Sequence, residues 1–184
     1  MKVTVAITGA SGVQYGIRLL QVLKKLNVEI HLIITTAAKE LIDIETNYSS
    51  DVITSLGTRT YDEMDFTAPI ASGSYMTDGM AIVPCSMKTL GSVANGISGN
   101  LVTRAAEVCL KEGRKLILVP RETPLTPIHL RNMMRVSESG ATVLPACPPF
   151  YTRPTTIEAL IDIIVARILD RLEIKHSISS RWGD

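Results

Sequence analysis

Residues 3–12 read VTVAITGASG, an alternating apolar run that leads into a turn with two glycines. The run over residues 3–7 predicts a buried β-strand, and the apolar spacing of residues 13–26 predicts a helix directly after the turn. A strand, a glycine turn and a helix in this order place backbone N–H groups at a helix N-terminus, where an anion is stabilised. The stretch therefore predicts the first strand–helix unit of a parallel sheet and a candidate phosphate site.

A second turn of the same kind follows the apolar run at residues 80–83 and reads PCSMKT over residues 84–89. It places Ser86 and Lys88 where the next helix begins. A lysine in the first turn of a helix is unfavourable against the helix dipole, so Lys88 favours an anionic ligand. Two such turns predict a nucleotide or flavin bound in a crevice at the carboxyl ends of parallel strands.

Apolar runs of strand length alternate with helical patterns along the rest of the chain. This alternation predicts an α/β fold in which a mostly parallel sheet is covered by helices on both faces. Gly140 stands where the helix before it needs a left-handed residue to end. The length of 184 residues predicts one domain, residues 1–184. The other predicted strands are 30–34, 116–119 and 141–144, and the other helices are 101–111, 127–139 and 156–172.

The composition narrows the class of partner. The formal charge is +1 and no run of like charges occurs, so neither a nucleic acid nor a membrane surface is favoured. No apolar stretch is long enough to cross a membrane, and no secretory signal pattern opens the chain. The cysteines lack C-x-x-C spacing and the histidines lack ligand spacing, so we expect a reducing cytoplasm, no disulfide framework and no metal. These residues are Cys85, Cys109, Cys147, His31, His129 and His176.

A nicotinamide dinucleotide is the least favoured ligand for the first turn. Tyr15 stands where the dinucleotide motif has its third glycine, and Gly16 comes one residue late. Such enzymes also place an acidic residue after the second strand to bind the ribose. Here that strand ends in Thr35 and Thr36, whose hydroxyls suit a phosphate or a flavin edge better.

Two segments and the last helix do not follow the scaffold pattern. Residues 49–74 are polar and weakly periodic and predict a short helix or an edge strand, while residues 145–154 predict a stiff aromatic loop of the kind that carries function. The helix at 156–172 is apolar on nearly every side, which predicts burial against another subunit in a homo-oligomer. Arg167 in this helix must snorkel, pair or hold an anion.

Taken together, the motifs resemble the UbiX-type flavin prenyltransferases. The resemblance covers residues 2–172 and includes Arg181 and Trp182 near the end of the chain. The motifs that carry it are residues 8–12 with Tyr15 and Gly16, residues 84–90, residues 101–106, residues 120–125 with 129–131, and residues 148–154. It implies a Rossmann-like (flavodoxin-like) three-layer sandwich that transfers a dimethylallyl group from dimethylallyl phosphate to N5 and C6 of reduced FMN. The product, prenylated FMN, would serve UbiD-type decarboxylases in ubiquinone biosynthesis or in aromatic acid decarboxylation. The family also implies a dodecamer with sites at subunit interfaces and no metal, and the tail at about 173–184 would pack on a neighbouring subunit.

The resemblance carries roles to individual positions. The FMN-binding positions are Gly9, Ala10, Ser11, Thr35, Ser86, Met87, Lys88, Thr89 and Arg121; Thr35 departs from the serine often found there but keeps a hydroxyl. The dimethylallyl phosphate positions are Tyr151 and Arg167, with Arg104 and Lys111 reaching in from a neighbouring subunit. Only 4% of the residues are aromatic, so Tyr75 and Trp182 are added beside Tyr151 as aromatic candidates for binding the dimethylallyl group. The catalytic positions are Glu45, Glu122, Ser11 and Tyr151.

The chemistry accounts for these residue types. Ionisation of an allyl phosphate leaves a delocalised carbocation and inorganic phosphate, so the site needs cations, hydroxyls and π-faces in a dry pocket. Ring closure at C6 needs a base, for which Glu122 is the candidate and the released phosphate the competitor. Two alternatives stay open: an FMN-dependent cysteine decarboxylase, whose early histidine the chain lacks, and a non-catalytic flavin carrier.

Overall fold

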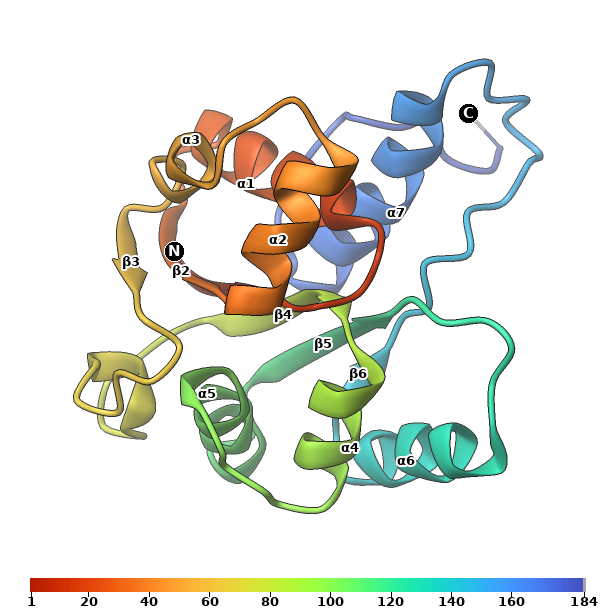
Figure 1. Cartoon of the computed structure of the whole chain (residues 1–184). Helices are drawn as coiled ribbons and strands as arrows, with labels where there is room; N and C mark the ends of the chain where they lie inside the picture. The colour runs from red at the N-terminus through yellow and green to blue at the C-terminus, as the bar shows by residue number, and fades with distance from the viewer. Residues whose placement is uncertain (184) are drawn as a thin grey trace.

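The structure, a computed structural model, describes residues 1–183 and contains a six-stranded parallel sheet (Figure 1). The strand order is β3-β2-β1-β4-β5-β6, and every neighbouring pair is parallel. This is the doubly wound order of Rossmann-like folds, so the predicted fold class is confirmed. The strands are β1 Lys2–Ile7, β2 Glu29–Ile34, β3 Arg59–Tyr61, β4 Gly79–Cys85, β5 Lys115–Pro120 and β6 Thr142–Val143.

Helices cover both faces of the sheet and make three layers (Figure 1). On one face α1, α2, α3 and α7 enclose one apolar core, and on the other α4, α5 and α6 enclose a second. Successive strand residues supply the two cores in turn: Val3, Val5 and Ile7 belong to the first, and Ala6 belongs to the second. The helices are α1 Val13–Lys25, α2 Thr36–Glu45, α3 Ser50–Thr54, α4 Met87–Ala94, α5 Leu101–Lys111, α6 Pro127–Glu138 and α7 Ile157–Arg171, with a 3₁₀ turn η1 at Pro69–Ala71.

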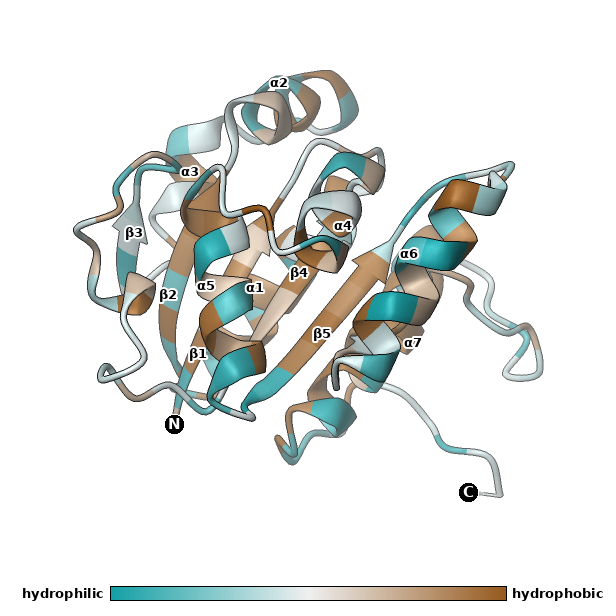
Figure 2. Ribbon diagram, turned by 90° about the horizontal axis from the view of Figure 1, so that it is seen from below, coloured by the Kyte–Doolittle hydropathy of each residue, from teal (hydrophilic) through white to brown (hydrophobic). Residues whose placement is uncertain are grey.

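The strands β1, β2, β4 and β5 are mostly apolar because helices bury both of their faces, whereas the edge strand β3 is polar and largely exposed (Figure 2). All seven residues of β4 are buried, whereas the helices carry apolar and polar bands in alternation (Figure 2). The apolar runs that predicted a sheet covered on both faces therefore arise because each strand contributes side chains to two cores, one on each face of the sheet.

Most predicted elements are present with shifted ends. The segment 49–74 holds both a short helix, α3, and an edge strand, β3. Gly140 has φ 99° and follows α6 as the predicted left-handed residue. The last strand is shorter than predicted, two residues instead of four, and α2 is a helix that the sequence reading did not assign. In the part of the chain that is described, no helix has the length and apolar run needed to cross a membrane.

The last helix is less enclosed than its sequence predicts. Ile163, Val165 and Ile168 are buried, but Ile157 is 71% exposed and the Arg167 side chain is 59% exposed. One chain therefore covers one side of α7 and leaves the other open. This exposure keeps the expectation of a neighbouring subunit in place.

Candidate functional site

A crevice opens at the carboxyl ends of β1 and β4, where the chain leaves neighbouring strands toward opposite faces of the sheet. This is the point at which open α/β sheets bind ligands. Its volume is about 570 Å³, within the range of small-molecule sites. It is lined by Thr8, Gly9, Thr35, Thr36, Ala37, Glu40, Glu63, Ser86, Met87, Lys88, Thr89, Asn100 and Glu122.

The Thr8 hydroxyl joins the two turns that the sequence singled out. Its Oγ1 donates to the carbonyl oxygen of Pro84 at 2.8 Å and accepts from the backbone N–H of Ser86 at 2.9 Å. The backbone N–H of Thr8 also lies 3.3 Å from the same Pro84 oxygen. Thr8 is 1% exposed, so these bonds form in the interior, where an unpaired partner costs free energy. The two turns therefore form one connected floor of the crevice.

Replacing Thr8 by valine, which has nearly the same shape, is expected to destabilise the fold by about 1–3 kcal/mol. Valine leaves the buried N–H of Ser86 without its acceptor and removes a donor to Pro84. Thermal unfolding and flavin titration would show a lower midpoint and weaker binding. Thr8→Ser keeps the hydroxyl and serves as the control; equal losses in both variants would exclude the hydrogen bonds as the cause.

The second turn provides groups that bind phosphate. Ser86 is the N-cap of α4: its Oγ accepts from the N–H of Thr89 at 3.2 Å and donates to the Thr89 hydroxyl at 3.0 Å. Lys88 follows in the first helical turn and lines the crevice. Hydroxyls and an ammonium group at a helix N-terminus are the groups that phosphate-binding sites use. The structure thus brings Ser86, Lys88 and Thr89 together as predicted.

The first turn differs from its prediction. The backbone N–H groups of Gly12 and Val13, at the start of α1, donate to Oε2 of Glu45 at 2.8 and 3.3 Å. The carboxylate supplies the negative charge that this helix N-terminus favours, so these two groups are not offered to a phosphate. Glu45 ends α2 and lines a separate cavity of about 360 Å³ beside Arg18 and Tyr48. Within one chain it therefore lies outside the main crevice.

Arg121 and Glu122 extend the site from the end of β5. Nε of Arg121 donates to the carbonyl oxygen of Ser11 at 3.0 Å, which ties this strand end to the first turn. Glu122 lines the crevice, and its Oε1 accepts from the backbone N–H of Thr123 at 3.1 Å. Predicted residues from three strand ends thus meet at one edge of the sheet.

Two further polar residues, Glu63 and Asn100, line the crevice and were not predicted from the sequence. Oε1 of Glu63 accepts from the backbone N–H and the hydroxyl of Thr36, each at 2.7 Å, and Oε2 accepts from Nδ2 of Asn100 at 3.4 Å. Burial raises the pKa of Glu63, but the hydrogen bonds from Thr36 outweigh it and hold the pKa below the ordinary 4.5. Glu63 lies in the polar segment 49–74, where no periodicity marked it.

The lowered pKa of Glu63 predicts an acid-dependent loss of stability. A carboxyl group with a lower pKa in the folded state stabilises the protein above its ordinary pKa, and that contribution disappears as the pH falls through the folded-state value. We expect Glu63→Gln to lower the unfolding midpoint at pH 7 and to flatten its fall below about pH 4.5. Midpoints of unfolding from pH 7 to pH 3 measure this. The exposed Glu138→Gln controls for loss of one carboxylate, and parallel curves for Glu63→Gln and the wild type would contradict the expectation.

Three of the residues predicted to hold the prenyl phosphate meet at a second, smaller cavity. Tyr151, Arg167 and Trp182 line a space of about 130 Å³ beside the carboxyl end of α7. The rings of Tyr151 and Trp182 pack edge to face with their centroids 4.9 Å apart. Asp184, the last residue of the predicted tail, lies outside the described residues.

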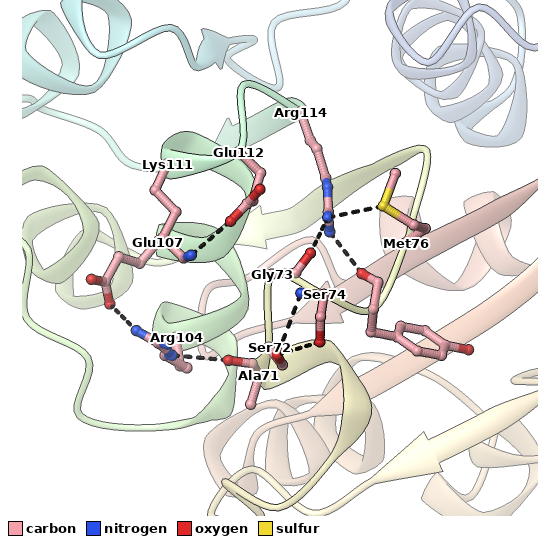
Figure 3. Close-up of polar contacts among 11 residues, drawn as sticks. Ala71, Ser72, Gly73, Ser74, Met76, Arg104, Glu107, Lys111, Glu112 and Arg114 are labelled. Atoms are coloured by element: carbon pink, nitrogen blue, oxygen red, sulfur yellow. Dashed lines mark hydrogen bonds and ion pairs between the residues drawn. The ribbon is translucent and has the colours of Figure 1, made fainter.

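The other predicted phosphate ligands lie elsewhere on the chain. Arg104 and Lys111, on α5, pair with Glu107 and Glu112 and lie over the loop at 71–76 (Figure 3). They line neither of these cavities of their own chain, and their reach into a neighbouring subunit stays a prediction.

Tyr75 is also away from both cavities. The Tyr75 ring packs edge to face on the ring of the buried His31 of β2, with 5.4 Å between the two centroids. The Nζ atom of Lys2 lies 5.0 Å from the centroid of the Tyr75 ring. The Tyr75 hydroxyl lies 3.2 Å from Nε2 of His31. Within one chain Tyr75 is thus a packing residue, and its contact with the prenyl donor stays a prediction.

Known proteins share this fold and these motifs. A family model described as Flavoprotein matches residues 1–181. The flavin prenyltransferase UbiX of Halalkalibacterium halodurans is 51% identical, and the alignment covers 98% of this chain and 93% of that protein. The crystal structure of AnUbiX (PadA1) in complex with FMN and dimethylallyl pyrophosphate superposes with a TM-score of 0.98 at 44% identity, covering 100% of this chain and 97% of that one. A dodecameric FMN-dependent UbiX-like decarboxylase from Escherichia coli O157:H7 also gives 0.98, at 45% identity and full coverage of both chains.

Proposed function

Because this chain belongs to the UbiX-type flavin prenyltransferases, we propose that it transfers a dimethylallyl group from dimethylallyl phosphate to N5 and C6 of reduced FMN. The flavin is then a substrate, released as prenylated FMN. One observation carries the proposal for this chain: Ser86, Lys88 and Thr89 gather at the N-terminus of α4 inside a crevice of about 570 Å³.

The residues of the crevice fit FMN. Its phosphate would lie against the hydroxyls of Ser86 and Thr89 and the ammonium of Lys88. Gly9 lets the first turn come close to α2, because a Cβ there would lie 2.7 Å from the Cβ of Ala37. The proposed flavin set is the one that the sequence named: Gly9, Ala10, Ser11, Thr35, Ser86, Met87, Lys88, Thr89 and Arg121.

The second cavity suits the other substrate. Arg167 and the Tyr151 hydroxyl would bind the phosphoryl group, and the faces of Tyr151 and Trp182 would stabilise an allylic cation. Glu122 would accept the proton from C6, and Glu45 and Ser11 would complete the set around the reacting atoms. Excluding water from such a cation is what a pocket of this kind contributes.

The neighbouring subunits complete this proposal. A relative 45% identical over its full length is dodecameric, and we extend that assembly to this chain. Arg104 and Lys111 would then act across an interface. The tail at about 173–184, predicted to pack on a neighbouring subunit, instead contacts α7 of its own chain through His176 and Arg181. The product would pass to a UbiD-type decarboxylase, in quinone synthesis or aromatic acid breakdown. The reducing cytoplasm is the proposed compartment, which the three free thiols support.

Mass spectrometry of the flavin released after anaerobic incubation with reduced FMN tests the reaction. Dimethylallyl phosphate and the diphosphate are supplied in parallel, since the AnUbiX complex holds the pyrophosphate. We expect a mass gain of one dimethylallyl unit that is absent without protein. Unmodified FMN, with both ligands shown to be bound, would replace this proposal by a flavin carrier or a decarboxylase.

A further inference from the structure

The segment after α7 folds back on the carboxyl end of that helix and carries His176. Nε2 of His176 lies 3.1 Å from Oδ1 of Asp170, and the His176 side chain is 2% exposed. Arg181 binds the same carboxylate with both terminal nitrogens, at 2.7 and 3.3 Å. Nη1 of Arg167 lies 3.8 Å from Oδ2 of Asp170, one helical turn away. Asp170 thereby connects His176 to the arginine proposed to hold the prenyl phosphate.

Nδ1 of His176 differs from every other buried polar side-chain atom of residues 1–183. It is the one such nitrogen or oxygen without a hydrogen-bond partner. Buried polar atoms are almost always paired, because an unpaired one costs free energy. Asp170 accepts the proton on Nε2, so Nδ1 is the ring position left for a further group.

The surroundings of His176 favour an anion. The 130 Å³ cavity that it lines is also lined by Arg167, Arg181 and Tyr151. Asp170 is the one acidic residue in its lining, and that carboxylate already binds Arg181 and His176. Burial raises the pKa of Asp170, but hydrogen bonds from Arg181 and His176 outweigh it and lower the pKa. The Asp170 carboxylate fixes the orientation of the ring that it contacts through Nε2.

We propose that His176 is a substrate-binding residue whose Nδ1–H donates a hydrogen bond to the phosphoryl group of the prenyl donor, while Asp170 holds the ring in place. This inference rests on the proposed function, which puts that phosphoryl group beside Tyr151 and Arg167. Because Nε2–H stays directed at Asp170, the proton between Nδ1 and the phosphoryl oxygen is the one that the phosphate monoester brings with it. The titratable and charged groups facing the ring are Asp170, Arg167, Arg181 and Tyr151.

Inorganic phosphate, the second product of the reaction, is the probe. His176→Gln is the informative variant, because the amide nitrogen of glutamine takes the place of Nε2 against Asp170 while Nδ1 is lost. We expect it to raise the Kd of phosphate and the KM of dimethylallyl phosphate about tenfold, the effect of one charge-assisted hydrogen bond. FMN affinity and assembly size should stay as in the wild type. The exposed neighbour Lys175→Gln is the control and should change either value less than twofold.

The outcomes separate this inference from the proposed function. A wild type that forms prenylated FMN, beside a His176→Gln variant with unchanged phosphate affinity, overturns the role of His176 alone. A wild type that binds phosphate without forming prenylated FMN overturns the function and leaves the His176 test in place. If the variant fails to fold, a crystal structure of the wild type with phosphate decides: an oxygen about 3 Å from Nδ1 supports the inference, and phosphate bound away from Nδ1 or not at all refutes it.

Discussion

Replacing Glu122 by glutamine is expected to let the first bond form at N5 and to stop ring closure at C6. The amide keeps the size of the side chain but cannot accept the proton, and loss of a general base lowers a rate by about 10²–10⁴-fold. Glu122 is suited to this role by its position at the end of β5, where it lines the crevice that also holds Lys88.

The measurement must follow the C6 position, because ring closure removes the proton of C6 and adds a proton to the double bond of the prenyl group, which leaves the mass unchanged. Proton magnetic resonance of the extracted flavin shows whether the hydrogen on C6 remains. Glu138→Gln, an exposed carboxylate on α6, serves as the control and should close the ring at the wild-type rate. A Glu122→Gln variant that loses the C6 hydrogen as fast as the wild type would assign the base to the released phosphate.

Replacing Gly16 by alanine is expected to give the largest loss of stability. A Cβ at this position would lie 3.0 Å from both Cδ1 and Cγ1 of Ile7, and closer still to the carbonyl oxygen of Val83. The oxygen belongs to the backbone of a fully buried strand, so it cannot move aside as a flexible side chain would. Overpacking of this kind costs about 1–3 kcal/mol, and we expect the upper part of that range.

Thermal unfolding measures this effect, since each kcal/mol corresponds to about 2–4 °C for a chain of this size. Gly91→Ala is the matched control within another helix, α4. Its Cβ would meet only Nδ2 of Asn132, at 3.4 Å, and alanine in a helix is favoured over glycine by about 0.5–1 kcal/mol. A Gly16→Ala variant as stable as Gly91→Ala would show that α1 can move away from the sheet.

Gly16 also shows which features of the fold could be predicted from the sequence and which could not. The dinucleotide pattern rejects it because it comes one residue late, yet in the structure it is the glycine that lets α1 pack closely on the sheet. The strands β1, β2, β4 and β5 could be predicted because both of their faces are buried, which leaves mostly apolar runs. Gly140 could be predicted because a left-handed residue is a local requirement of a helix end.

The parts that escaped prediction depend on contacts between distant segments. Glu63 reaches Thr36 across 27 residues, and Glu45 reaches Gly12 across 33; neither spacing leaves a periodic signal. Tyr75 was drawn into the candidate site by the rarity of aromatic residues, but packing against His31 is what positions it. Tyr151, Arg167 and Trp182 were predicted from the sequence and line one cavity, whereas His176 could be found only from its buried, unpaired nitrogen.

The carboxylate of Glu45 at the start of α1 bears on which flavin the crevice accepts. Dinucleotides in folds of this order lay their pyrophosphate on that helix N-terminus. Here the position is already held by a negative side chain, whose Oε2 binds Gly12 at 2.8 Å. A pyrophosphate would have to displace it or lie against a like charge. The fold thus retains the anion site of the first turn but fills it with its own carboxylate, so that helix N-terminus is not open to the pyrophosphate of a dinucleotide.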